Sequence, residues 1–208
     1  MTDFARSERL ALTALLREVG PSAPTLCEGW TTEDLAIHLV VRDRFPTALP
    51  GNTAPGAVGR FPRLLARTES AEARLRSLAW EELVGLVGEG EPWWSPAGLP
   101  PVRELVNGTE LLVHHEDVRR AQDEWAPRVL SDAHQRSAWN TVRMFARMSA
   151  LRSGTRYALT ALTPSGGVLE TVECGRGTAG GSVELRGEPL ELLLWFFGRK
   201  DHALLDGD

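Results

Sequence analysis

The sequence predicts an α+β protein in which a helical first part precedes a small α/β unit. Two observations carry this prediction: apolar residues recur at helical spacing as far as about residue 151, and segments typical of strands appear only beyond Gly154. We therefore expect a helical bundle over residues 1–152 and a small C-terminal domain over residues 153–208, with the boundary near 152–155.

The first part contains several helical segments, separated by loops rich in glycine and proline. The opening helix should end at Gly20-Pro21, and Thr31 followed by Asp34 resembles a capping box at the start of the second. Ser131 is the expected N-cap of the last helix. The predicted helices span residues 2–19, 31–45, 60–79, 80–88, 101–123 and 131–151.

The tail changes from helical spacing to strands and back. RYALTALTP and GGVLETVECG are predicted strands joined by a turn, and GGSVELRG is predicted to be a third strand. GEPLELLLWFFGRK then returns to helical spacing. This order indicates a small α/β domain.

Composition excludes several classes of protein. The 208 residues are 42% hydrophobic and 25% charged, as in an ordinary soluble domain, and the net charge of -5 argues against a nucleic-acid partner. No apolar stretch is long enough for a membrane span, and no signal peptide is visible. Cys27 and Cys174 are too far apart for a cysteine zinc site. A cytoplasmic location is expected.

Two predicted helices place polar groups on apolar stripes, which suggests a metal site. Glu110 and His114 are one helical turn apart and share a face, and Asp117 lies one turn further on. His38 occupies a similar stripe on the second helix. Two imidazoles and a carboxylate suit zinc, or alternatively nickel. The other interpretation is a satisfied buried pair of Glu110 and His114, with His38 unrelated. His115 is expected to face solvent.

Three motifs carry a resemblance to a known family. W-T-x-x-D-L-x-x-H-L over residues 30–39, E-x-x-x-H-x-x-D over residues 110–117, and the final LLLWFFGR are similar to motifs of the mycothiol-dependent maleylpyruvate isomerase-like proteins. These belong to the DinB/YfiT superfamily, and the chain most resembles its uncharacterised actinobacterial metal-binding branch. The resemblance covers nearly the whole chain.

The resemblance implies a DinB-like four-helix bundle followed by a sterol-carrier-like α/β domain. It also implies a divalent metal held by His38, Glu110 and His114, with mycothiol as the thiol cosubstrate that attacks as a thiolate. The commonest ligand pattern of the superfamily has three histidines. Glu110 departs from that pattern and favours the isomerase-like branch.

The function expected from these features is that of a thiol-dependent transferase or isomerase acting on a small molecule. No protein cysteine is predicted near the metal, so the thiol would be external. Asp117 is expected either to support a ligand or to act as a base, and Arg199 either to bind an anionic group or to cap the last helix. The rival functions are a non-catalytic module that binds a metal or a small ligand, and a metal-dependent hydrolase.

The Trp93-Trp94 pair lies in the proline-rich loop EGEPWWSPAGLPP. It is expected either to cover a pocket or to close one end of the bundle, and the second interpretation is the simpler one.

Overall fold

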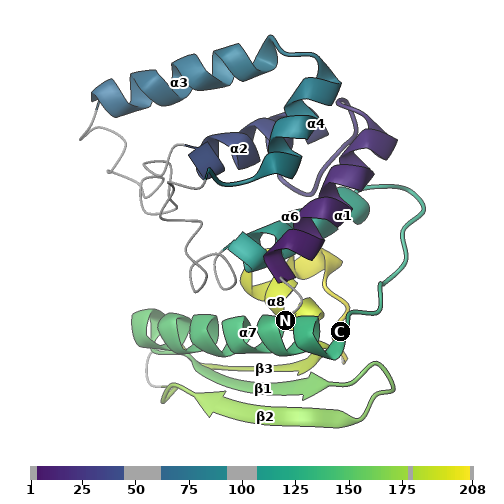
Figure 1. The fold of residues 1–208 in the computed structure, drawn as a ribbon. Helices are drawn as coiled ribbons and strands as arrows, with labels where there is room; N and C mark the ends of the chain where they lie inside the picture. The colour runs from purple at the N-terminus through teal and green to yellow at the C-terminus, as the bar shows by residue number, and fades with distance from the viewer. Residues whose placement is uncertain (1–3, 45–61, 93–106, 178–179, 207–208) are drawn as a thin grey trace. The chain divides into compact units, whose positions relative to one another are not determined.

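The protein has an α+β fold, seen in a computed structural model that describes residues 4–44, 62–92, 107–177 and 180–206 (Figure 1). These ranges contain seven α-helices and one three-stranded sheet. The chain divides into two compact units, a helical first unit (Met1–Trp125) and a second unit that holds the sheet (Ala126–Asp208).

The first unit is built from five described helices that pack through their apolar faces. Helix α1 packs against α4 and α6, and α2 packs against α3 and α4. Leu12, Leu39 and Leu111 have no exposed surface in the core between them. The five helices are α1 (Phe4–Val19), α2 (Thr32–Arg44), α3 (Pro62–Arg76), α4 (Trp80–Glu89) and α6 (Gly108–Arg119).

A reciprocal pair of hydrogen bonds fixes the start of α2, as the capping-box motif predicts. The Thr31 backbone N–H donates to Asp34 Oδ2 at 3.0 Å, and the Asp34 N–H donates to Thr31 Oγ1 at 3.4 Å. The preceding loop is tied to α6, because the Leu26 N–H donates to the Asp117 carbonyl at 3.0 Å. This loop therefore carries Cys27 toward α6.

The second unit packs two helices with a mixed sheet of order β2-β1-β3. Strand β1 pairs with β2 antiparallel and with β3 parallel. Tyr157, Leu159 and Ala161 alternate along β1 and are buried, which gives the sheet a covered face. The elements are α7 (Asp132–Ser153), β1 (Arg156–Leu162), β2 (Val168–Cys174), β3 (Ser182–Gly187), α8 (Pro189–Phe196) and a short 3-10 helix (Lys200–His202).

Helix α7 marks a difference from the predicted domain boundary. It begins at the predicted cap, where Ser131 Oγ accepts from the His134 N–H, and it packs against α8, β1 and β2 (Figure 1). Trp139 Nε1 donates to Glu170 of β2 at 2.7 Å. The two units therefore divide at residues 125 and 126 instead of near 152–155. An apolar helical stripe predicts burial but does not specify the partner.

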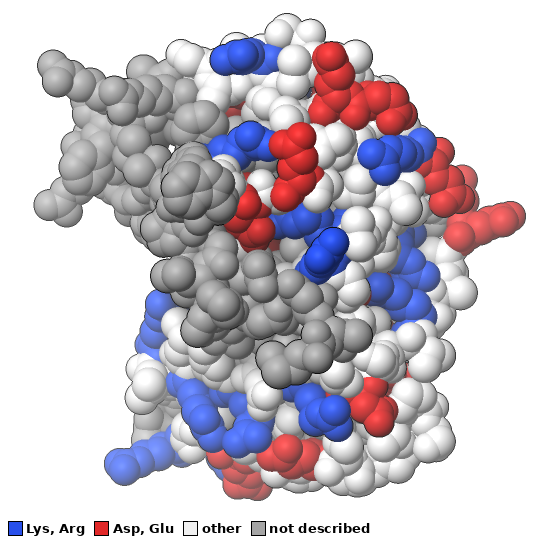
Figure 2. Space-filling model, viewed as in Figure 1, with Lys and Arg blue, Asp and Glu red and all other residues white. Residues whose placement is uncertain are grey.

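The surface charge and the hydropathy of the described helices are in line with what the composition predicts. Figure 2 shows acidic side chains interspersed among the basic ones on the face that it presents. Among the described helices, none combines the length and the apolarity needed to cross a lipid bilayer.

Candidate metal centre

The structure brings together the three predicted ligands, one from α2 and two from α6. Glu110 Oε1 lies 3.4 Å from His114 Nε2 and 3.8 Å from His38 Nε2. The ligand atoms of all three side chains lie within 4.8 Å of one another. Two elements far apart in sequence thus converge on a single carboxylate oxygen.

Exposure shows that the cluster is open on one side. The His38 and Glu110 side chains are 33% and 20% exposed, whereas the His114 side chain is 9% exposed. The Trp30 ring lies 5.1 Å from the His38 ring, centroid to centroid, and so contacts this imidazole from the loop before α2. Solvent therefore reaches the cluster over His38 and Glu110.

Asp117 orients the buried imidazole from its far side. Asp117 Oδ2 lies 2.9 Å from His114 Nδ1, and the Asp117 side chain has no exposed surface. When Nδ1 donates to this carboxylate, the lone pair of Nε2 faces Glu110, as a metal ligand requires. Asp117 is therefore placed to support His114, and its burial separates it from any solvent molecule that a base would have to deprotonate.

Cys27 lies beside this pair, which corrects the expectation that no cysteine is near the site. Its thiol donates to Asp117 Oδ2 at 3.3 Å, and Sγ lies 4.0 Å from His114 Nδ1. Cys27, His114 and Asp117 also have ligand atoms within 4.8 Å of one another. That second group would use Nδ1, which Asp117 already engages. No sequence motif predicts this contact, because the position of Cys27 depends on how the loop before α2 folds against α6.

Burial and neighbouring charges set the protonation of the ligands. Burial alone would raise the pKa of Glu110, but hydrogen bonds from His114 and His38 and the charge of Arg42 hold that pKa well below its ordinary value. Burial alone would lower the pKa of His114. Hydrogen bonds with Asp117, Cys27 and Glu110 outweigh that effect and raise this pKa well above 6.5. A metal ion must therefore displace a proton from His114.

Arg42 is a second residue that the sequence reasoning missed. It lies one turn beyond His38 on α2, and its side chain is only 4% exposed. Its Nε is 3.7 Å from Glu110 Oε1, the oxygen that faces both imidazoles. Arg42 belongs to none of the three motifs. In the sequence it looks like an ordinary charged residue near the end of a helix.

His115 contradicts the expectation that it faces solvent. Its side chain is 8% exposed, and its Nδ1 lies 3.1 Å from Glu8 Oε2. The reason is that α6 is buried on nearly all sides, so the face that carries His115, about 100° around the helix from His114, packs against α1 instead of meeting water. Helical periodicity alone does not reveal a helix with two buried faces.

Arg199 and the tryptophan pair complete the predicted set. Arg199 lies in the second unit, after α8, where its Nη1 donates to the Phe197 carbonyl at 2.5 Å. This contact matches the capping alternative. Trp93 and Trp94 lie outside the described residues, so their predicted role stays a prediction.

The donor set fits a divalent cation on chemical grounds. Two imidazole nitrogens and one carboxylate oxygen, with one imidazole held by a buried carboxylate, form a ligand set that zinc enzymes use when a coordination position stays open. A comparison of the chain with protein-family models, with curated proteins and with solved structures finds no match in any of the three. The assignment of function therefore depends on the site itself.

Proposed function

We propose that this protein binds a divalent metal through His38, Glu110 and His114 and uses it in a thiol-dependent transferase or isomerase reaction. The observation that carries the proposal is the convergence of both imidazole Nε2 atoms on Glu110 Oε1, at 3.4 and 3.8 Å, on the open side of the cluster. Zinc is the proposed metal, with nickel as the alternative. The bound ion would supply a lowered thiol pKa and an oriented nucleophile.

Each residue of the chain has a separate part in this proposal. His38 and Glu110 hold the partly exposed side, where a small molecule can approach. His114 provides the buried ligand, and Asp117 keeps its Nε2 lone pair aimed at the same point. Cys27 donates to Asp117 and lies on the Nδ1 side of His114, so the reacting thiol in this proposal is external.

The resemblance of the motifs supports mycothiol as the thiol cosubstrate and a small molecule as the second substrate. It also supports a DinB-like bundle for the first part of the chain and a sterol-carrier-like fold for the tail. The proposed location is the cytoplasm, where low-molecular-weight thiols are kept reduced. Arg199 stays a candidate for binding an anionic group of either substrate.

The rival functions are less well supported by the geometry. A hydrolase of this design needs a base that can reach water, and Asp117 is fully buried and engaged with His114. A purely structural metal site is usually closed by four protein ligands, whereas the described residues of this cluster offer three and are partly exposed.

Metal analysis tests the site directly. The protein is purified without chelators, and its metal content is compared with that of the His38→Ala and Glu110→Ala variants. His202→Ala, which removes an exposed histidine in the second unit, is the matched control. We expect metal in the parent chain and in the control, and its loss in both ligand variants. Equal, negligible metal in all four proteins would refute the site.

Thiol dependence is tested on the cobalt-substituted protein. Addition of a small thiol such as 2-mercaptoethanol is expected to produce a sulfur-to-cobalt charge-transfer band, because a position on the metal is open. A cobalt spectrum that does not respond to thiol would favour the structural function. Hydrolysis of an activated ester in the absence of thiol would favour the hydrolase.

A further inference from the structure

Arg42 differs from the other buried arginines of the described residues. Arg9 donates to Asp43 at 2.7 Å and to the Val87 carbonyl at 3.0 Å, and Arg120 donates to Glu116 at 2.7 Å. Arg42 has no such contact: its Nε and Nη2 are buried and have no hydrogen-bond partner. Buried guanidinium groups are normally satisfied, so this exception calls for an explanation.

Among the described residues, Arg42 forms an ion pair with Glu110, a carboxylate of the candidate metal centre. Arg42 Nε lies 3.7 Å from Glu110 Oε1, which is too long for a hydrogen bond but close enough for a strong electrostatic interaction. His38 Nε2 and His114 Nε2 converge on that same oxygen. A metal ion bound to Glu110 would therefore compete with Arg42 for its negative charge.

The formal charges around a metal-loaded centre indicate which kind of ligand it would favour. A dication and Arg42 together contribute three positive charges, and Glu110 and Asp117 contribute two negative ones. Asp43 and Glu91 both pair with Arg9, at 2.7 and 3.2 Å, so neither donates its charge to Arg42 through a hydrogen bond. A metal ion that takes up the charge of Glu110 would therefore leave the buried Arg42 guanidinium without a carboxylate partner of its own, and an anionic ligand on the metal would offset that charge.

We propose that Arg42 makes this centre selective for anionic ligands, so that the molecule taken up at the open side carries a negative charge beside the metal. The inference rests on the proposed metal site and deepens it by naming the ligand class. Arg42 acts through its charge at short range, because its Nε and Nη2 have almost no accessible surface. It is thus a specificity-determining residue and not a group that touches the reacting atoms.

The experiment compares a small anion with a neutral ligand on the cobalt-loaded full chain. Thiocyanate and imidazole are titrated separately, and the visible cobalt spectrum reports the affinity of each. In Arg42→Met we expect thiocyanate affinity to fall about tenfold or more, because a charge within a few ångströms is removed. Imidazole affinity should change less than about twofold, because a neutral ligand does not feel that charge.

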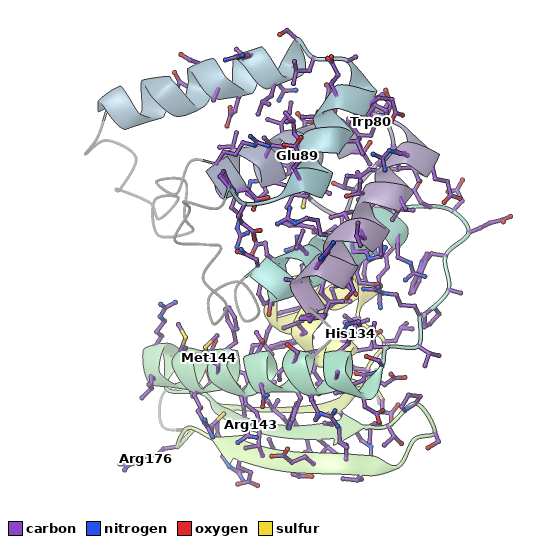
Figure 3. The ribbon with its side chains drawn as sticks, in the orientation of Figure 1. Trp80, Glu89, His134, Arg143, Met144 and Arg176 are labelled. Carbon is purple, nitrogen blue, oxygen red and sulfur yellow. The ribbon has the colours of Figure 1, made fainter. Side chains whose placement is uncertain are left out.

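Three further variants separate charge from other effects. Arg42→Lys keeps the charge and should bind thiocyanate within about threefold of the parent chain. Arg44→Met removes an arginine from the same helix whose Nη2 is paired with Glu89 (labelled in Figure 3) at 2.6 Å, and should behave like the parent chain. If Arg42→Met does not unfold cooperatively, Arg42→Gln keeps a donor without the charge and should show the same loss.

The outcomes distinguish this inference from the proposed function. Failure of the parent chain to take up cobalt would refute the metal site itself, before any anion is added. Normal cobalt uptake together with unchanged thiocyanate affinity in the neutral Arg42 variants would overturn only the role of Arg42. A loss of imidazole affinity equal to the loss of thiocyanate affinity would overturn it too, because the effect would then not depend on ligand charge.

Discussion

His114 and His115 are neighbours on α6, and both are buried beside carboxylates, but their surroundings differ in kind. His115 meets one partner, Glu8 at 3.1 Å, and both side chains are almost fully buried. His114 meets Asp117 on one nitrogen and Glu110 on the other, and Glu110 is 20% exposed. The first arrangement is buried throughout, whereas the second extends from a buried imidazole to ligand atoms that are partly exposed.

This difference separates a structural histidine from a candidate ligand better than burial or pairing alone. Both imidazoles offset the cost of burying a carboxylate, so pairing does not distinguish them. The distinguishing features are a second imidazole, His38, aimed at the same oxygen and the side of the cluster that is open to solvent. Substitutions at the two positions should therefore affect different properties of the protein.

The largest expected effect is on metal binding. His114→Ala should weaken metal binding by more than about 100-fold, which exceeds the range for a residue that only supports a ligand. His115→Ala should keep the metal affinity of the parent chain within a few-fold. Isothermal titration with zinc measures both variants. Comparable losses of affinity in the two variants would contradict the assignment of His114 as a ligand and His115 as a structural residue.

The next largest effect is on stability, and here His115 should matter more than His114. His115→Ala removes the imidazole partner of buried Glu8, and we expect the free energy of unfolding to fall by about 1–3 kcal/mol. Denaturant unfolding of the metal-free protein measures this loss. Glu8→Gln, which keeps a hydrogen-bonding group opposite His115, should cost less. An unchanged unfolding midpoint in His115→Ala would contradict a structural role for the pair.

A smaller effect on metal affinity is expected at Asp117, which contacts the Nδ1 atom of His114. Asp117→Asn keeps the size of the side chain but presents a weaker acceptor to Nδ1, so zinc affinity should fall about 10–100-fold. In Cys27→Ala, which removes the thiol contacts to Asp117 and His114, zinc affinity should fall by less. Titration of both variants gives the order. If Asp117→Asn binds zinc as tightly as the parent chain, Asp117 does not support the metal site.

The smallest effect is a pH dependence of the metal-free protein. The pKa of His114 is raised above 6.5, so its stabilising contribution is fully present below 6.5 and is lost as pH rises through the raised value. The pKa of Glu110 is lowered below 4.5, so its contribution is present above 4.5 and is lost as pH falls through the lowered value. Together these two groups stabilise the fold most between about pH 4.5 and 6.5.

The free energy of unfolding of chelator-treated protein, measured across this pH range, shows whether stability falls on both sides as expected. His114→Gln should flatten the decline in stability on the alkaline side, because its side chain does not titrate. His115→Gln serves as the neighbouring control and should keep the decline. Identical pH profiles for the parent chain and His114→Gln would contradict the pairing on which the raised pKa depends.

The candidate ligands could be predicted because their spacing is a local property. Glu110 and His114 share a face of any helix that contains both, and His38 lies on an apolar stripe of its own helix. The strands of the tail, the Ser131 cap and the pairing of Thr31 with Asp34 were also predictable from neighbouring residues. Each depends on groups only a few positions apart.

Residues that act across the fold were not predictable. Cys27 reaches Asp117 over 90 positions, and His115 reaches Glu8 over 107. Arg42 is unusual only because its surroundings hold no hydrogen-bonding partner for Nε and Nη2. None of these contacts has a periodic signal, because each depends on which elements pack together.

The sequence by itself determined which faces of α2 and α6 carry ligand-type side chains, since helical geometry follows from the backbone and not from the neighbours. Only the tertiary structure decided that the two faces meet at Glu110, that the face of α6 with His115 is buried against α1, and that α7 belongs with the sheet. The physical reason is that apolar burial has no direction: a stripe must be covered, but many surfaces can cover it.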